Sequence, residues 1–200
     1  MLKIKTAKFV KSAVDVNGLL RGTPSVVFAG KSNSGKSSLI NMLLNNSKLA
    51  RTGQTPGLTQ CVNYFDVSSS INNINKNFFF VDLPGYGYAK SGKAKTKDFS
   101  ALVEAYLTDN SDIKQLFLLI DIRNGASDND RMLVNFLNYH QVPFTVIATK
   151  ADKLSKVQQF AGRRVLAGDL AIGEQNILIT SSQTKQGRDD VLSLIEQKIN

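Results

Sequence analysis

The sequence of 200 residues predicts an α/β fold in which helices cover both faces of a mostly parallel β-sheet. Two observations predict this class. Short, nearly continuous apolar runs have the length of buried strands, and segments with apolar residues at helical spacing alternate with them. This alternation is typical of strand–helix–strand units, which stack into three layers. In such a sheet ligands bind at the carboxyl ends of the strands, so functional residues are expected there.

The first half of the chain predicts three strands and one helix. The run SVVFAG, residues 25–30, is expected to be a buried strand that leads into a helix beginning near Lys36. One face of this helix carries apolar residues at the i, i+3, i+4 spacing, namely Ile40, Leu43 and Leu44. The runs VNYFDV and NFFFVD flank the polar stretch 68–77 and predict a hairpin, which would form an antiparallel edge of the sheet.

The second half predicts three more strands, which makes six in all. The runs LFLLID (116–121) and PFTVIATK (143–150) are almost uninterrupted, as expected for parallel strands covered on both faces. Between them we expect a helix with the capping candidates Ser127 and Asp128. Its apolar stripe consists of Leu133, Phe136 and Leu137. A last strand, NILITSS, precedes a helix whose apolar face carries Leu192, Ile195 and Ile199.

Composition limits the classes of protein to consider. The hydrophobic fraction of 42% is ordinary for a globular chain, and the longest apolar runs are far too short to span a membrane. The N-terminal stretch MLKIKTAKFVKSAV spreads lysines through the place where a signal peptide needs an uninterrupted apolar core. The single cysteine, Cys61, cannot form an internal disulfide, and one histidine with one cysteine argues against a zinc site. We therefore expect a cytoplasmic protein with no membrane partner.

The net charge favours polyanionic partners. Lysine and arginine outnumber the acids 25 to 16, which gives a formal charge of +9. Such an excess attracts phosphates over long range and gains free energy from counterion release. Many basic proteins bind no nucleic acid, so charge alone does not identify the partner. No helix-turn-helix or other DNA-reading element is visible in the sequence, and DNA is not expected to be the partner.

A phosphate-binding loop is the clearest functional signal. The segment GKSNSGKS, Gly30 to Ser37, matches the pattern G-x-x-x-x-G-K-[ST] directly after a strand and at the start of a helix. Glycines let the backbone wrap around phosphates, and the amide hydrogens point inward at the positive end of the helix. Lys36 would neutralise β- and γ-phosphate charge, and the Ser37 hydroxyl would bind Mg²⁺. The sequence therefore predicts a P-loop NTPase fold.

Later strand ends favour guanine over adenine. The motif TKAD, Thr149 to Asp152, follows the strand PFTVIATK. Asp152 can accept hydrogen bonds from N1 and N2 of guanine, and adenine lacks that amino group, while the aliphatic stem of Lys150 can lie along the base. The motif TSS, Thr180 to Ser182, ends the next strand, where backbone amides could reach guanine O6. An ATP-dependent kinase would leave Lys150 and Asp152 without a role.

Residues for Mg²⁺ and the γ-phosphate follow from two other segments. Asp82 ends a strand at the usual place for a carboxylate that holds Mg²⁺ through a water molecule. Three residues later, Gly85 leaves room for its N–H group to touch the γ-phosphate. In the segment RTGQTPGLTQ, Thr59 is the best candidate to reach both Mg²⁺ and the γ-phosphate. Thr52 and Thr55 are alternatives that spacing alone does not separate from it.

Taken together, GKSNSGKSS, TPGLTQ, DLPGYGYAK, TKAD and TSS resemble the EngB family of bacterial ribosome-biogenesis GTP-binding proteins, within the TrmE–Era–EngA–EngB–septin-like superfamily. The resemblance covers nearly the whole chain. It implies one Ras-like G domain over residues 1–200, with a basic N-terminal segment (1–23) and a GTPase core (24–200). It also implies binding of GTP or GDP with Mg²⁺, a role in assembly of the large ribosomal subunit, and a need in normal cell division and septation. We expect a monomer.

The resemblance also assigns site residues. By motif position it places Mg²⁺ on Ser37 and Thr59, with Asp82 acting through water. It implies nucleotide contacts from Gly30, Lys31, Ser32, Asn33, Ser34, Gly35, Lys36, Ser37, Ser38, Gly57, Leu58, Thr59, Gln60, Cys61, Asp82, Leu83, Pro84, Gly85, Thr149, Lys150, Ala151, Asp152, Thr180, Ser181 and Ser182. Two positions depart from the family pattern: Lys31 replaces the usual arginine, and Ser34 replaces a frequent valine.

The residue after Gly85 raises a question about hydrolysis, because Tyr86 stands where many switches carry a water-orienting glutamine. We favour a partly buried packing role for Tyr86, since a phenol is a poor base at neutral pH. Catalytic support is expected from Lys36, Thr59, Gly85 and Asn33. GTPases similar to this one, with asparagine at that place, can hold K⁺ near the phosphates; a local loop hydrogen bond explains Asn33 equally well.

Turnover is therefore expected to be slow and to be stimulated by K⁺ or by the ribosomal partner. The alternative is a nucleotide-dependent module that binds RNA with negligible turnover. The basic run AKSGKAKTK is either a solvated face or a segment that docks on rRNA phosphates, through Lys90, Lys93, Lys95 and Lys97. A second basic group could extend this footprint, or could equally protect an edge strand from aggregation; it consists of Lys3, Lys5, Lys8 and Lys11.

Overall fold

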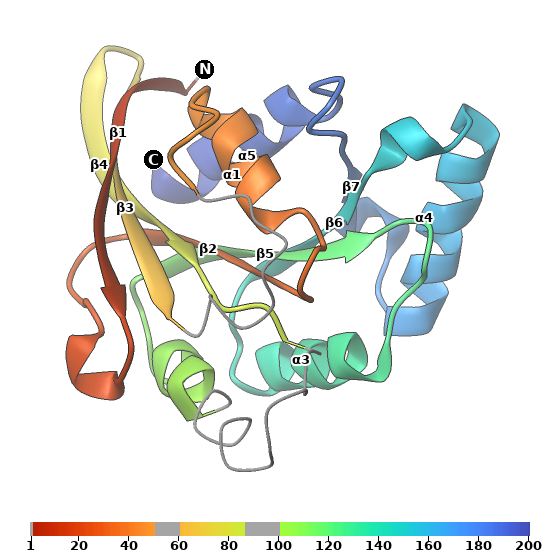
Figure 1. Cartoon of the computed structure of the whole chain (residues 1–200), viewed down its shortest axis with the longest axis horizontal. Helices are drawn as coiled ribbons and strands as arrows, with labels where there is room; N and C mark the ends of the chain where they lie inside the picture. Colours follow the sequence, from red (N-terminus) through yellow and green to blue (C-terminus); the bar gives the residue numbers. More distant parts are fainter. Residues whose placement is uncertain (1, 51–60, 87–100) are drawn as a thin grey trace.

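The computed structural model describes residues 2–50, 61–86 and 101–200. Within them one sheet of seven strands has the order β1-β3-β4-β2-β5-β6-β7 (Figure 1). The strands are β1 (Lys3–Ala13), β2 (Ser25–Gly30), β3 (Val62–Ile71), β4 (Ile74–Asp82), β5 (Ile113–Asp121), β6 (Phe144–Thr149) and β7 (Ile177–Ile179). The strands β4, β2, β5, β6 and β7 run parallel, whereas β3 is antiparallel to both β4 and β1.

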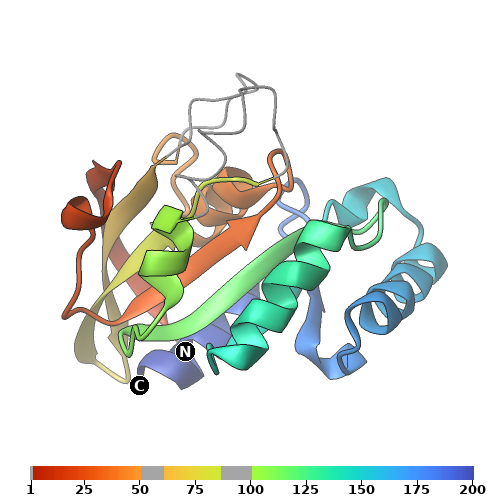
Figure 2. The same ribbon diagram turned by 90° about the horizontal axis from the view of Figure 1, so that it is seen from below.

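Helices cover both faces of the sheet, as the sequence predicts (Figures 1 and 2). The helices α1 (Lys36–Leu44) and α5 (Arg188–Ile199) pack on one face, where Ile40 and Ile195 are fully buried. The helices α3 (Asp128–Tyr139) and α4 (Lys156–Leu170), with a helical segment over residues 101–107, share the other core. Short 3-10 turns complete the fold: η1 (Val16–Gly18), η2 (Ala151–Lys153) and η3 (Glu174–Asn176).

The predicted count of six strands is wrong, because the N-terminal segment adds a seventh strand. β1 pairs antiparallel with β3 at the edge of the sheet. Leu2 is buried, and Ile4 and Ala7 pack against the core beneath α1 and α5, so this face stabilises the strand by apolar burial. Two register shifts interrupt the pairing, between Ile4 and Thr6 and between Phe9 and Lys11. Bulges and lysines on an edge strand both discourage pairing with other chains.

The predicted hairpin is confirmed, but its turn is much shorter than the polar stretch 68–77. β3 and β4 continue through that stretch, with Ser69 opposite Lys76 and Ile71 opposite Ile74. Only Asn72 and Asn73 remain in the turn, with φ angles of 49° and 67°. Asparagine tolerates this left-handed conformation, which two-residue hairpin turns require. Because β3 pairs on both sides, its polar residues are held in the ladder whatever their intrinsic propensity.

The end of β5 and the start of α3 follow local signals. Ser127 is the N-cap of α3 and forms a capping box with Asp130, while Asp128 is the first helical residue. The sequence does not predict helix α4, because its buried residues Leu166 and Leu170 lie in its second half and the exposed Phe160 interrupts the apolar spacing expected of a helix.

In the part of the chain that the structure describes, no helix combines the length and apolarity needed to cross a bilayer.

Candidate functional site

The predicted motifs meet at one edge of the sheet. β2 ends at Gly30, β4 at Asp82 and β6 at Thr149, and these strands are parallel members of one sheet. Parallel strands bring their carboxyl ends to the same edge. Residues from three separate parts of the sequence therefore lie at the same edge.

The phosphate loop has the backbone that its glycines predict. A Cβ atom on Gly30 would lie 2.6 Å from the Leu119 carbonyl oxygen, so only glycine fits where β2 passes β5. Gly35 has a φ of 100° and directly precedes α1, which begins at Lys36 as predicted. Asn33 also has a positive φ, 65°, a conformation that asparagine tolerates. This backbone explains the choice of asparagine without a bound cation, and it leaves the K⁺ hypothesis open.

A buried charge pair lies beneath the loop. Lys36 is only 9% exposed, and its ammonium group donates to the Gly30 carbonyl oxygen at 3.1 Å. Burial lowers the pKa of Lys36, against the opposing effect of Asp82. Asp82 is 4% exposed, and burial raises its pKa to about 6 although Lys36 acts to lower it.

Two polar atoms at this edge have no hydrogen-bond partner among the described residues: Asp82 Oδ1 and Ser34 Oγ. A buried orphan of this kind is costly and calls for a ligand, ion or water. Carboxylate and hydroxyl oxygens are the ligands that Mg²⁺ prefers, and Mg²⁺ in nucleotide sites completes its shell with phosphate and water. The residues present therefore fit Mg²⁺ bound together with a nucleotide.

The TKAD segment is tied directly to the phosphate loop. The Thr149 hydroxyl donates to the Ser34 carbonyl oxygen at 2.7 Å, and the Lys150 ammonium donates to the Asn33 carbonyl oxygen at 2.8 Å. Lys150 has a φ of 61°, so the chain turns sharply after β6. These bonds place the predicted base-binding residues beside the predicted phosphate-binding residues, although about 115 residues separate them in sequence.

Asp152 and the TSS segment also come together. The Ser181 hydroxyl donates to the Asp152 carboxylate at 2.6 Å, and this bond lowers the pKa of Asp152. The Ala151 amide donates to the Thr180 carbonyl oxygen at 3.1 Å. Ser181 is fully buried and Ser182 is half-buried. The Ser181 hydroxyl also accepts a hydrogen bond from the Thr184 amide, so Ser181 holds both the Asp152 carboxylate and the turn that follows. An ionised Asp152 with a fixed orientation is suited to accept two hydrogen bonds from a base edge.

Sequence reasoning missed Asp121, the last residue of β5. Its carboxylate accepts from Arg123 at 2.9 Å and 2.7 Å and lies 3.0 Å from the Lys150 ammonium. Burial acts to raise the pKa of Asp121, but hydrogen bonds from Arg123 and Lys150 outweigh it and lower the pKa to about 2. Asp121 therefore anchors Lys150. An acidic residue at the end of a buried strand, on the edge that carries the other motifs, was the available signal.

The segment after β4 touches the phosphate loop. A Cβ atom on Gly85 would lie 2.9 Å from the Ser32 amide nitrogen, so glycine is required for this approach. The Ser32 amide donates to the Tyr86 carbonyl oxygen at 3.1 Å. Leu83 is buried in the core and Pro84 is also buried, so Leu83 supports this segment from below.

Tyr86 is a packing residue, as the sequence interpretation favoured. Its ring contacts the core beneath α3, and its hydroxyl donates to the Asp130 carboxylate at 2.5 Å. Burial first, and the neighbouring Asp130 second, raise the pKa of Tyr86 far above its ordinary value. A phenol held in this way cannot act as a general base near neutral pH.

Several predicted residues lie outside the described part of the chain. They are Thr52, Thr55, Gly57, Leu58, Thr59 and Gln60 in one segment and Lys90, Lys93, Lys95 and Lys97 in another. Cys61, next to the first of these segments, is half-buried with a free thiol. The roles assigned to the residues of these two segments remain predictions.

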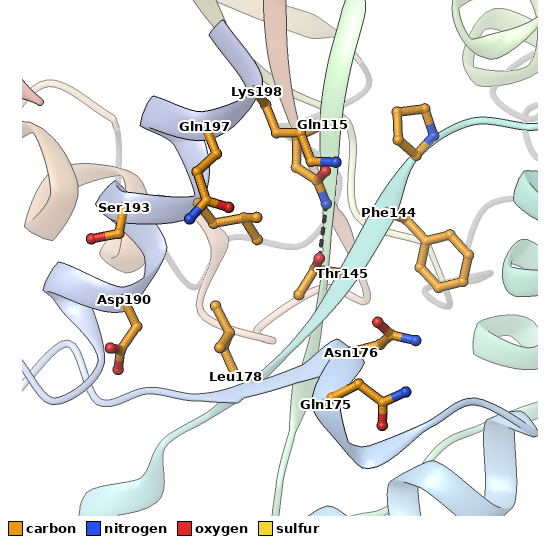
Figure 3. Close-up of a pocket in the computed structure, with 12 residues that line it drawn as sticks. Gln115, Phe144, Thr145, Gln175, Asn176, Leu178, Asp190, Ser193, Gln197 and Lys198 are labelled. Atoms are coloured by element: carbon orange, nitrogen blue, oxygen red, sulfur yellow. Dashed lines mark hydrogen bonds between the residues drawn. The ribbon is translucent and has the colours of Figure 1, made fainter. Parts of the chain in front are cut away.

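A cavity unrelated to these motifs lies at the amino ends of β5 and β6, beside α5 (Figure 3). Its volume is about 470 Å³, and a hydrogen bond of 2.9 Å joins Gln115 and Thr145 in its wall. None of the predicted site residues lines it. The cavity and the candidate site lie at opposite ends of the parallel strands, so the cavity is not part of the candidate site.

Comparison with known proteins agrees with this geometry. The profile of a family described as "50S ribosome-binding GTPase" matches residues 25–150. A "Probable GTP-binding protein EngB" of Fusobacterium nucleatum is 40% identical over 201 residues, covering 100% of each chain. The protein of the same name from Bacillus subtilis is 37% identical, again covering 100% of each chain.

Solved structures agree on the fold. A crystal structure of a probable GTP-binding protein EngB has a TM-score of 0.65 and 23% identity, covering 88% of this chain and 98% of that one. Era in complex with MgGDPNP and part of 16S ribosomal RNA has a TM-score of 0.68 and 20% identity, covering 90% of this chain and 58% of that one. At such identities these structures support the fold alone, whereas the sequence relatives define the family. The chain belongs to the EngB family of GTP-binding proteins and is a GTPase.

Proposed function

We propose that this GTPase is a nucleotide switch in the assembly of the large ribosomal subunit, and that normal cell division and septation depend on it. The main observation that supports a nucleotide switch is that the Thr149 hydroxyl and the Lys150 ammonium donate hydrogen bonds to carbonyl groups of the phosphate loop. It joins base recognition and phosphate binding in one site. The ribosomal role is supported by the family description, "50S ribosome-binding GTPase", and by the net charge of +9.

The site residues are proposed to divide the nucleotide between them. Asp152 reads the guanine edge while Lys150 covers the base, and Lys36 neutralises the β- and γ-phosphates at the N-terminus of α1. Ser37, Thr59 and, through water, Asp82 would hold Mg²⁺. When bound, Mg²⁺ neutralises charge that develops on the phosphate oxygens. Gly85 would sense the γ-phosphate through its amide.

We further propose that intrinsic hydrolysis is slow and that K⁺, a ribosomal particle or both complete the site. The Tyr86 hydroxyl donates its hydrogen bond to Asp130, so it cannot orient a water molecule as glutamine does. Phosphoryl transfer depends mainly on positioning and charge stabilisation, so a missing group can be supplied by a cation or by a partner. Asn33 is the proposed contact for K⁺.

The basic edge strand is the proposed docking surface for ribosomal RNA in the described part of the chain. Lys3, Lys5 and Lys8 are exposed along β1. Lys8 is paired with Asp66 at 3.4 Å and Lys5 with Asn75 at 2.7 Å. Such exposed pairs are weak in water and exchange readily for phosphate contacts.

Two measurements test this proposal. Single-turnover GTP hydrolysis is measured in K⁺ and in Na⁺, with and without large ribosomal subunits. The expected result is a slow rate in Na⁺ alone and acceleration by at least one of the two additions. Equal, fast rates in all four conditions would contradict the timing proposal, and no turnover in any of them would identify a binding module with negligible hydrolysis.

The second measurement is sedimentation of the protein with large ribosomal subunits in GTP and in GDP. A variant with Lys3, Lys5 and Lys8 changed to glutamine should bind about tenfold more weakly and with a flatter salt dependence. The matched control changes Lys114, Lys156 and Lys198 to glutamine. These lysines lie in β5, α4 and α5, away from β1, and the change removes the same amount of charge. Equal weakening in both variants would mean that net charge alone attracts the ribosome and that β1 is not a docking surface.

A further inference from the structure

Asp130, in the first turn of α3, is joined to the segment that ends at Tyr86. Its side chain is 1% exposed. One oxygen, Oδ1, accepts the Tyr86 hydroxyl at 2.5 Å, and the other, Oδ2, accepts the Ser127 amide at 2.7 Å and the Ser127 hydroxyl at 2.6 Å. A hydrogen bond to a buried carboxylate is short and strong, because the acceptor is charged. Both oxygens of Asp130 are therefore engaged, one by the helix cap and one by Tyr86.

Tyr86 carries this contact to the phosphate loop. Its carbonyl oxygen accepts the Ser32 amide at 3.1 Å, and Lys31 and Tyr86 form an isolated parallel bridge. Gly85, one residue earlier, lies so close to Ser32 that a Cβ atom would not fit. The backbone of Gly85 and Tyr86 is thus held from two sides, by the phosphate loop through main-chain contacts and by α3 through the phenol.

We propose that Asp130 is a positioning residue for GTP hydrolysis. By fixing the Tyr86 hydroxyl it holds the Gly85 amide against the phosphate loop, where that amide is to meet the γ-phosphate. The inference rests on the proposed role of Gly85. Because the segment is held at both the phosphate loop and α3, loss of the contact with α3 would shift the backbone of Gly85 and Tyr86 at the phosphate loop. A displacement of about an ångström at a reacting centre costs about 100-fold in rate. The fixed position of Tyr86 thus serves to hold the Gly85 amide in place and does not replace the water-orienting glutamine.

The competing explanation is that Asp130 only caps α3. Its Oδ2 completes the capping box with Ser127, and such caps stabilise helices in many proteins. The two roles use different oxygens of the same carboxylate, so variants can separate them. Tyr86→Phe removes the hydroxyl and keeps the packed ring, Ser127→Ala removes the cap and keeps the bond to Tyr86, and Asp130→Asn perturbs both.

The test is single-turnover hydrolysis of GTP, with affinities for GDP and for a non-hydrolysable GTP analogue measured in parallel. For Tyr86→Phe we expect a rate about tenfold lower, weaker binding of the analogue, and unchanged affinity for GDP, which lacks the γ-phosphate. Asp130→Asn should show a loss of the same size, and the double variant should be no slower than either single variant, because both remove one interaction. Ser127→Ala should hydrolyse GTP at the wild-type rate while its Tm falls.

Three outcomes would overturn the inference. They are a wild-type rate in Tyr86→Phe, an additive loss in the double variant, and a loss in Ser127→Ala equal to that in Asp130→Asn. If Asp130→Asn does not fold, the comparison of Tyr86→Phe with Ser127→Ala decides alone. Failure of the switch proposal itself looks different, since the wild-type protein would then bind the GTP analogue no differently from GDP.

Discussion

The proposed guanine side and the proposed γ-phosphate side of the site are built differently. On the guanine side, the side chains already have hydrogen-bond or ion-pair partners within the protein. Thr149 is bonded to Ser34, Lys150 to Asn33 and Asp121, and Ser181 to Asp152. On the proposed γ-phosphate side, by contrast, Asp82 Oδ1 is buried without a partner in the described part of the chain. The preorganised side can bind base and sugar at a low cost in ordering.

The difference teaches which part of the site is suited to report the nucleotide state. Both GTP and GDP carry guanine, so rigid base recognition serves both equally. Under the proposed function, a γ-phosphate with Mg²⁺ would contact groups that GDP leaves unpaired, and a ligand shifts a conformational equilibrium only through such differential contacts. Lys36 is the proposed contact of both the β- and the γ-phosphate, so its loss is expected to matter most.

Lys36→Ala is expected to have the largest effect, because it would weaken the proposed binding of the β-phosphate, which GTP and GDP share, as well as that of the γ-phosphate. Removing one member of a buried charge pair leaves Asp82 uncompensated and removes the phosphate contact. The affinities for GTP and for GDP should both fall about 100-fold or more, as measured with a fluorescent guanine nucleotide. Lys114→Ala, at the other end of β5, is the control. A loss confined to GTP would contradict a contact between Lys36 and the β-phosphate, which GDP also carries.

Asp152→Asn should break the guanine side alone. A neutral amide replaces the ionised carboxylate, so affinity for guanine nucleotides should fall about 10- to 100-fold, the range expected for hydrogen bonds to a charged group. Xanthine nucleotides, which present an acceptor where guanine presents its amino group, should bind better to the variant than to the original protein. Competition binding with both bases measures this. Unchanged base preference would place base recognition elsewhere.

Thr149→Val tests the link between the two sides. Valine keeps the volume but loses the hydrogen bond to the Ser34 carbonyl oxygen, which would be left buried and unpaired. Affinity for GDP should fall about tenfold, with a similar change for GTP, in the same binding assay. Thr149→Ser keeps the hydroxyl and is the matched control. Equal losses in both variants would assign the effect to packing and exclude the hydrogen bond as its cause.

Asp121→Asn should have the smallest effect. The amide can still accept a hydrogen bond from one of its two partners, so Lys150 should become more mobile without leaving the site. We expect affinity for GDP to fall about threefold, because the ion pair is partly exposed to solvent. Arg123→Gln removes the other partner of Asp121 and provides the comparison. A larger loss in Arg123→Gln would mean that the arginine, and not the anchoring of Lys150, carries the effect.

The phosphate loop and three of the helices that cover the sheet, α1, α3 and α5, could be predicted because each depends on short-range pattern. GKSNSGKS fixes its own turn, since glycine and asparagine occupy the positive-φ positions, and Ser127 caps α3 through a residue three positions away. The partners that Asp121 and Asp130 meet could not be predicted in this way. Their partners, Lys150 and Tyr86, lie far away in sequence, and nothing local marks which carboxylate will meet them.

By itself, the sequence determined the α/β class and the order of the motifs along the chain, because periodicity and motif spacing are local properties of the chain. Only the tertiary structure decided that the basic N-terminal segment is a seventh strand, that Thr149 and Lys150 bond to the phosphate loop, and that Tyr86 faces Asp130. Those contacts arise from the pairing of distant strands and the packing of helices onto them. Free energy of that kind depends on which surfaces meet, and short segments of sequence do not record it.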